Sequence, residues 1–149
     1  MIAKLRAAPD ALEKAVAGLT AEQLTAHYLP DEWSAAQNVH HVADAHIISF
    51  YRMKTMLVDT NPAIYPVIPD TWAALADADN ADVASSLQLL KGLHARWARL
   101  FDSLNEAQWL RAAVRANGST MTVEDVLRIY ANHTYNHIEQ INKTLAAAQ

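Results

Sequence analysis

Apolar side chains spaced alternately four and three residues apart are the feature that most constrains the fold of this chain. Between Asn80 and Leu104, one helical face would carry Val83, Leu87, Leu90, His94, Trp97, Phe101 and Leu104. Such spacing keeps a continuous stripe turned toward neighbouring helices. The segment from Asn80 to Leu104 is therefore predicted to be one long helix packed along its length in a bundle.

The composition also favours helices over sheets. Of the 149 residues, 52% are hydrophobic, but only three are glycine and five are proline. Glycine and proline interrupt helices, whereas the Ala, Leu, Gln and Glu that are abundant here favour them. The length suits one hydrophobic core, so we expect a single domain over residues 1–149.

Two further helices are predicted in the first part of the chain. One should run from about Pro9 to Leu19, because a proline in the first turn loses no hydrogen bond. Ser34 and Gln37 have the spacing of a capping box, in which each side chain bonds the other's backbone N–H. They predict the start of a long helix that continues to about Leu57.

The remaining segments supply a long connection, a hairpin and a last helix. Prolines interrupt the helical pattern over residues 59–79, which form the longest connection in the chain. Asn117 and Gly118 are a tight-turn dipeptide and predict a small hairpin within residues 111–121. Thr122 can cap the final helix. The sequence thus predicts an all-α fold, an up-and-down four-helix bundle with one long crossover loop.

Two histidines in the last predicted helix suggest a metal site. His133 and His137 are four residues apart, so they share a helical face, and their ring nitrogens could meet at a metal about 2.0 to 2.1 Å away. His40, His41 and His46 lie in the second long helix and offer a third ligand. The alternative is that the histidines only pack, but an unsatisfied buried polar group costs about 1 to 3 kcal/mol.

Charge and cysteine content exclude several functions. The net charge is −4, and no run of Lys and Arg mixed with aromatic residues is present, so nucleic-acid binding is not expected. No apolar segment is long enough to span a membrane, and residues 1–10 lack the apolar part of a signal peptide, so we expect a soluble cytoplasmic protein. The chain has no cysteine. Any thiol chemistry would therefore use a thiol from outside the protein.

Four motifs in the right order resemble the DinB-like superfamily, and in particular its YfiT-like branch of metal-dependent hydrolases. The resemblance covers the chain from Pro9 to Ile141. Its motifs are Glu32-Trp33-Ser34 followed by His41, Asp44 and Arg52; Asp70-Thr71-Trp72; Leu93 to Trp97; and Tyr130 to Ile141 with His133, His137 and Gln140. One departure is Arg115-Ala116-Asn117-Gly118, where YfiT-like sequences usually carry a His-Pro pair and a following glycine.

The resemblance implies a divalent metal held by His41, His133 and His137. Zinc is the first expectation and nickel the alternative, because three imidazoles suit both. His40 and His46 would point about 100° and 140° away from His41 on an ideal helix, so structural or surface roles are expected for them.

Three imidazoles would leave a coordination position open, as in catalytic zinc sites. Two reactions fit: hydrolysis, and transfer to a low-molecular-weight thiol by an S-transferase, as in some relatives. In either case the resemblance implies a small-molecule substrate and a homodimer. The competing hypothesis is a non-catalytic dimeric bundle with a structural metal or none.

Residues one turn from the predicted ligands are candidates for catalysis. Asp44 could accept an imidazole N–H or assist proton transfer, but it could equally be a surface carboxylate or a partner of Arg52. Tyr130 could contact substrate or pack in the core. Gln37 could orient a ligand. Gln140 could contact substrate, and Trp33 and Trp72 could line the mouth of the pocket, but large aromatic residues more often pack, and packing is the role we expect for Trp33.

Overall fold

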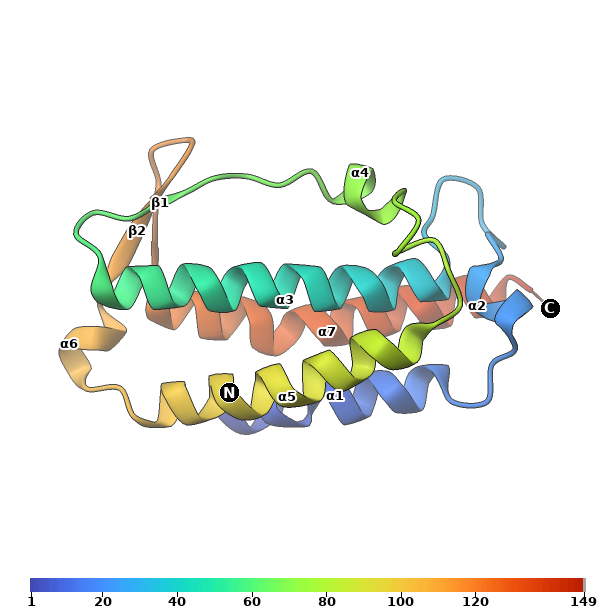
Figure 1. Ribbon diagram of the computed structural model, residues 1–149, viewed down its shortest axis with the longest axis horizontal. Helices are drawn as coiled ribbons and strands as arrows, with labels where there is room; N and C mark the ends of the chain where they lie inside the picture. Colours follow the sequence, from blue (N-terminus) through green and yellow to red (C-terminus); the bar gives the residue numbers. More distant parts are fainter. Residues whose placement is uncertain (149) are drawn as a thin grey trace.

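Four long helices make up most of the computed structural model, which describes residues 1–148. They are α1 (Ile2–Val16), α3 (Ala35–Val58), α5 (Val83–Asp102) and α7 (Val123–Ala146), and they pack side by side as a bundle (Figure 1). The shorter elements are α2 (Ala21–Thr25), β1 (Ala63–Ile64), α4 (Pro69–Ala73), α6 (Glu106–Trp109), β2 (Ala112–Arg115) and β3 (Thr120–Thr122). The predicted four-helix bundle with one long crossover is confirmed.

The crossover sets the directions of the helices. It leaves the end of α3 and returns along the length of the bundle through β1 and α4 to the start of α5 (Figure 1). As a result α3 and α5 run parallel, and α1 and α7 run in the opposite direction. Side-chain contacts follow this order: His40 of α3 bonds Ser86 near the start of α5, and Met53 contacts Trp97 further along both helices.

The first helix begins earlier than its proline suggested. The prediction of a start near Pro9 is wrong, because α1 begins at Ile2 and Pro9 lies inside it. An interior proline removes the N–H that would bond the carbonyl four residues before it, here that of Leu5. The structure supplies a substitute donor, because Nδ1 of His94 lies 2.6 Å from the Leu5 carbonyl oxygen. A contact with a helix that is distant in the sequence thus makes the proline tolerable.

The predicted start of α3 and the predicted hairpin are confirmed. Ser34 and Gln37 form a capping box at the start of α3. Strands β2 and β3 pair antiparallel around the Asn117-Gly118 turn, where Gly118 has a φ of 81° that favours glycine. Strand β1 pairs parallel with β2 and ties the crossover to the hairpin.

The bundle interior contains the stripe that the sequence predicted on α5. Leu90, His94, Trp97 and Phe101 are all almost completely buried, so the prediction that this face is a bundle seam is confirmed. None of the helices in the described residues combines the length and hydropathy needed to cross a membrane.

Candidate metal centre

Three histidines converge between α3 and α7. His41 comes from α3, and His133 and His137 come from successive turns of α7. One ring nitrogen of each lies within 4.8 Å of those of the other two. The ring centroids are 4.7 Å apart for His41 and His137, 5.3 Å for His41 and His133, and 4.6 Å for the α7 pair. The structure therefore brings together the three residues predicted as ligands.

Asn38 fixes the orientation of the His137 ring. The Asn38 amide nitrogen donates to the carbonyl oxygen of Ser34 at 3.0 Å, which identifies the other amide atom as the oxygen. That oxygen lies 2.8 Å from Nδ1 of His137 and must accept a hydrogen bond from it. Since a neutral imidazole carries one proton, Nε2 of His137 is left with a free lone pair.

The distance between the two α7 imidazoles fits a shared metal ion. Nε2 of His137 lies 3.3 Å from Nε2 of His133. Two nitrogens bound to zinc at about 2.0 to 2.1 Å in tetrahedral geometry would be about 3.3 to 3.4 Å apart. The donor set therefore suits a divalent cation such as zinc.

Burial keeps these histidines neutral, as metal ligands must be. It lowers the pKa of His41 to about 4, with a further decrease from His137 and a smaller opposing effect of the Asp70 carboxylate. Burial likewise lowers the pKa of His133 to about 3, reinforced by His137 and His41. The pKa of His137 is also lowered by burial, and a hydrogen bond to Gln140 that raises it opposes this effect. At neutral pH all three rings can offer a lone pair.

A small cavity opens beside His137. It has a volume of about 250 Å³ and is lined by Asp31, Glu32, Trp33, Asp70, His137 and Gln140. The Trp33 ring lies 4.7 Å from that of His41, and its Nε1–H donates to Asp70 at 3.2 Å. Trp33, for which packing was expected, and Gln140 both line this cavity, and any contact of theirs with a substrate stays a prediction. Trp72 instead lines a different surface cavity with Tyr65.

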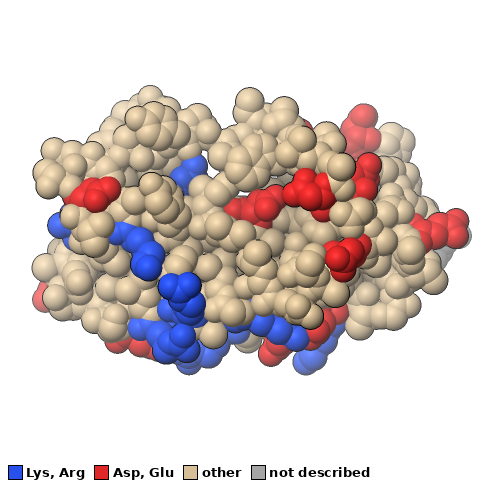
Figure 2. All heavy atoms as spheres, viewed as in Figure 1, with Lys and Arg blue, Asp and Glu red and all other residues tan. Residues whose placement is uncertain are grey.

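The surroundings of this cavity are acidic. Of its three carboxylates, that of Glu32 is paired with Lys143 at 2.6 Å, whereas Asp70 accepts from Trp33. Figure 2 shows acidic side chains around α4 and the α2 end of the molecule, while the basic side chains on that face lie mostly at its lower left. A ligand approaching from this side would meet a negative potential.

The two predicted catalytic residues lie apart from the open side of the site. Asp44 is half-buried and lines a separate cavity of about 220 Å³ with His40 and Asp77. Burial and the Asp77 carboxylate raise the pKa of Asp44. Tyr130 packs in the core, with its ring 5.5 Å from both His133 and Trp97. Their catalytic roles stay predictions without contact to the cavity beside His137.

Three residues with clear contacts to the site were not predicted to serve it. Asn38 holds His137, and His46 lies with Nε2 3.1 Å from Nδ1 of His133. His94 contacts His46 in turn, with 2.8 Å between nitrogens. Gln37, the predicted orienting residue, is used by the capping box and by a bond to the carbonyl of Ala73. One signal was available: a histidine within the apolar α5 stripe needs a buried partner.

Comparison with known families assigns the class of protein. Residues 4–141 match the model of the DinB superfamily. The chain belongs to the DinB superfamily.

Individual relatives narrow the similarity to one branch. The chain is 42% identical over 141 residues to a protein of Geobacillus thermodenitrificans strain NG80-2 named "Putative metal-dependent hydrolase", covering 94% of this chain and 79% of the relative. It is 36% identical over 140 residues to the YfiT protein of Bacillus subtilis strain 168, which carries the same description, covering 93% and 79%. The predicted resemblance to YfiT-like proteins is confirmed.

Solved structures agree with the fold. The structure of Bacillus subtilis YfiT, described as a probable metal-dependent hydrolase with an unusual four-helix bundle topology, superposes with a TM-score of 0.91 at 35% identity, covering 96% of this chain and 82% of YfiT. A mycothiol-dependent maleylpyruvate isomerase shares the fold with a TM-score of 0.70 at 16% identity, covering 99% and 67%.

Proposed function

We propose that this chain is a metal-dependent hydrolase that acts on a small molecule at a zinc ion held by His41, His133 and His137. The observation that carries the proposal is that three imidazole nitrogens, one from each histidine, lie within 4.8 Å of one another. The description of its relatives as metal-dependent hydrolases supports the same reaction. The cavity of about 250 Å³ beside His137 suits a small ligand.

The protein's own groups would bind and orient the reactants. Zinc at such a site supplies Lewis acidity, which polarises a carbonyl group and makes a bound water or thiol more acidic. Asp70 is the wall carboxylate with a direct electrostatic effect on His41, so we assign it the role of accepting a proton from the nucleophile. Trp33 donates to Asp70 and holds that carboxylate toward the cavity. Gln140, on the same wall, can donate to a polar group of the substrate.

Thiol transfer is the second candidate reaction. The fold is shared with a mycothiol-dependent isomerase, and the chain contains no cysteine to serve as an internal nucleophile. An external thiol would therefore have to enter the same cavity. Hydrolysis is preferred because the relatives that carry that description are far more similar in sequence.

Metal content is the direct test. Tag-free wild-type protein should contain close to one equivalent of zinc after incubation and desalting, measured by mass spectrometry. His41→Ala and His137→Ala should each lose it. His40→Ala is the matched control, because His40 neighbours His41 but bonds Ser86 and Asn80 instead. Equal zinc contents in all four proteins, or none in the wild type, would overturn the proposal.

The reaction type can be tested with the loaded enzyme. Zinc-dependent turnover of activated esters or amides, lost in His137→Ala, would support hydrolysis. For the second candidate, a low-molecular-weight thiol should change the visible spectrum of the cobalt-substituted protein, and an unchanged spectrum would exclude it. Stoichiometric metal with neither effect would favour the non-catalytic bundle with a structural metal.

A further inference from the structure

A hydrogen-bonded relay of three histidines leads from the candidate metal centre across the bundle to α1. Nδ1 of His133 lies 3.1 Å from Nε2 of His46, and Nδ1 of His46 lies 2.8 Å from Nε2 of His94. Nδ1 of His94 then lies 2.6 Å from the carbonyl oxygen of Leu5. Helix α3 packs against both α7 and α5. Each of these three helices contributes one histidine, and α1 contributes the final acceptor.

The Leu5 carbonyl is free to end this relay because of Pro9. Within α1 its usual donor would be the backbone N–H of residue 9, which proline lacks. Leu5 is fully buried, so its carbonyl oxygen must find a donor inside the protein. His94 is the donor that the structure provides.

A carbonyl oxygen can only accept a hydrogen bond, and this sets the proton positions along the whole relay. His94 must carry its proton on Nδ1, so its Nε2 is an acceptor. His46 must then donate from Nδ1, which leaves its own Nε2 as an acceptor for the Nδ1 proton of His133. Nε2 of His133 is left without a proton. Each step uses only the single proton of a neutral imidazole.

The rings are placed to hold this arrangement. His46 and His94 are 0% and 1% exposed, which disfavours a second proton on either ring. Their planes differ by only 6°, and the 2.8 Å between nitrogens is too short for face-to-face stacking, so they meet edge to edge as an N–H···N bond requires. The rings of Trp97 and Tyr130 stand nearly perpendicular to His46, at 5.8 and 5.0 Å between centroids, and restrict its rotation.

We propose that His46 and His94 are positioning residues which, anchored on the Leu5 carbonyl, fix the tautomer of His133 so that its Nε2 lone pair faces the metal position. His137 reaches the same state independently through Asn38. The two Nε2 atoms that face each other at 3.3 Å are then both unprotonated, an arrangement that a shared cation would stabilise. The inference rests on the proposed metal site for its purpose, but the tautomers themselves do not depend on metal.

The first test reads the tautomers in metal-free protein. Long-range ¹H–¹⁵N NMR spectra distinguish the protonated from the unprotonated ring nitrogen of each histidine. We expect His94, His46 and His133 all to carry the proton on Nδ1, although histidine in water prefers Nε2. A proton on Nε2 of either His46 or His133 would overturn the relay, whether or not the protein binds zinc.

The second test interrupts the relay at His94. His94→Phe removes the acceptor for His46, whereas His94→Gln keeps an oxygen that can accept the same bond. Zinc affinity, measured by competition with a chelator, should fall about 10- to 100-fold in His94→Phe and much less in His94→Gln. His40→Phe is the matched control for replacing a buried histidine. His40 bonds Ser86 and is not part of the relay, so this substitution should leave zinc affinity unchanged.

The outcomes separate the relay from the metal site. Nδ1 protons on all three histidines without zinc binding would support the relay and overturn the proposed function. Zinc binding with equal affinity in wild type, His94→Phe and His94→Gln would support the metal site and overturn the relay. If His94→Phe does not fold, the wild-type tautomers still decide the question.

Discussion

At the scale of single residues, the candidate centre depends on which imidazole nitrogen carries the proton. Asn38 settles this for His137, because its amide nitrogen is committed to Ser34 and only its oxygen faces the ring. Partners of this kind orient metal ligands and raise their basicity. A residue that touches no metal can therefore control how well a ligand binds one.

Replacing Asn38 should weaken metal binding without removing a ligand. Asn38→Leu leaves the His137 ring without its acceptor, and we expect zinc affinity to fall about 10- to 100-fold. Asn38→Asp keeps an acceptor oxygen and should bind zinc within a few-fold of wild type. Chelator competition measures both, and equal affinities in all three proteins would contradict the role of Asn38.

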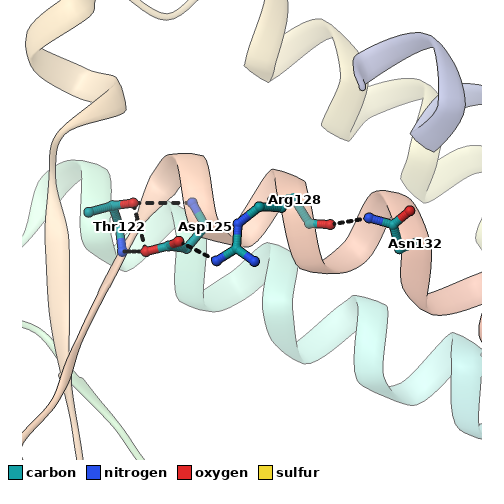
Figure 3. Close-up of polar contacts among 4 residues, drawn as sticks. All are labelled: Thr122, Asp125, Arg128 and Asn132. Carbon is teal, nitrogen blue, oxygen red and sulfur yellow. Dashed lines mark hydrogen bonds and ion pairs between the residues drawn. The ribbon is translucent and has the colours of Figure 1, made fainter.

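At the scale of secondary structure, α7 matters most because it carries two of the three histidines. Its first turn is closed by a capping box: Thr122 Oγ1 accepts from the Asp125 backbone N–H, and the Asp125 carboxylate accepts from the Thr122 backbone N–H (Figure 3). Arg128 donates to the same carboxylate at 2.6 Å. The ion pair with Arg128 and the bonds from Thr122 lower the pKa of Asp125 to about 2, so the cap persists at neutral pH.

Removal of this cap should reduce stability but leave the site intact. Thr122→Ala should lower the free energy of unfolding by about 1 kcal/mol, because one backbone donor loses its partner. Thr122→Ser retains the hydroxyl and should lose less. Urea denaturation measures both variants. Zinc affinity should not change, because the cap lies about three turns before His133; a large loss of affinity would mean that the cap positions the ligands.

At the scale of the whole molecule, the bundle interior holds an unusual concentration of neutral histidine. Burial lowers the pKa of five histidines below their ordinary value: His41, His46, His94, His133 and His137. When the chain unfolds, these rings regain an ordinary pKa near 6.5 and can bind protons that the folded state resists. Stability must then depend on pH.

The metal-free protein should lose stability in mild acid. Between about pH 6.5 and pH 4 the unfolded chain binds more protons than the folded one, so the free energy of unfolding falls as the pH falls. Since several histidines act together, the slope between pH 6 and pH 5 should exceed about 1.4 kcal/mol per pH unit, the value for one proton. Urea denaturation at each pH measures it.

A variant can attribute this slope to the interior. His46→Gln removes one titrating group and should reduce the slope by up to about 1.4 kcal/mol per pH unit, the contribution of one proton. A free energy of unfolding that is constant from pH 7 to pH 5 would contradict the neutral-histidine interior. A slope unchanged in His46→Gln would show that other groups cause the loss.

Much of the architecture followed from local signals. The α5 stripe, the Ser34–Gln37 capping box and the Asn117-Gly118 turn act over a few residues, and each is found where it was predicted. The start of α1 was wrong because the cost of Pro9 is offset by His94, which is distant in sequence. Local signals cannot include such compensation.

The sequence by itself determined four helices, their long crossover and, through its family resemblance, the three histidines that would hold a metal. These properties depend on helical periodicity, capping and the spacing of a few side chains, all of which involve residues close together in the sequence. Only the tertiary structure decided that α3 and α5 run parallel, and therefore that His46 and His94 meet behind His133. Proton positions in the site follow from contacts among four helices, and no stretch of sequence contains them.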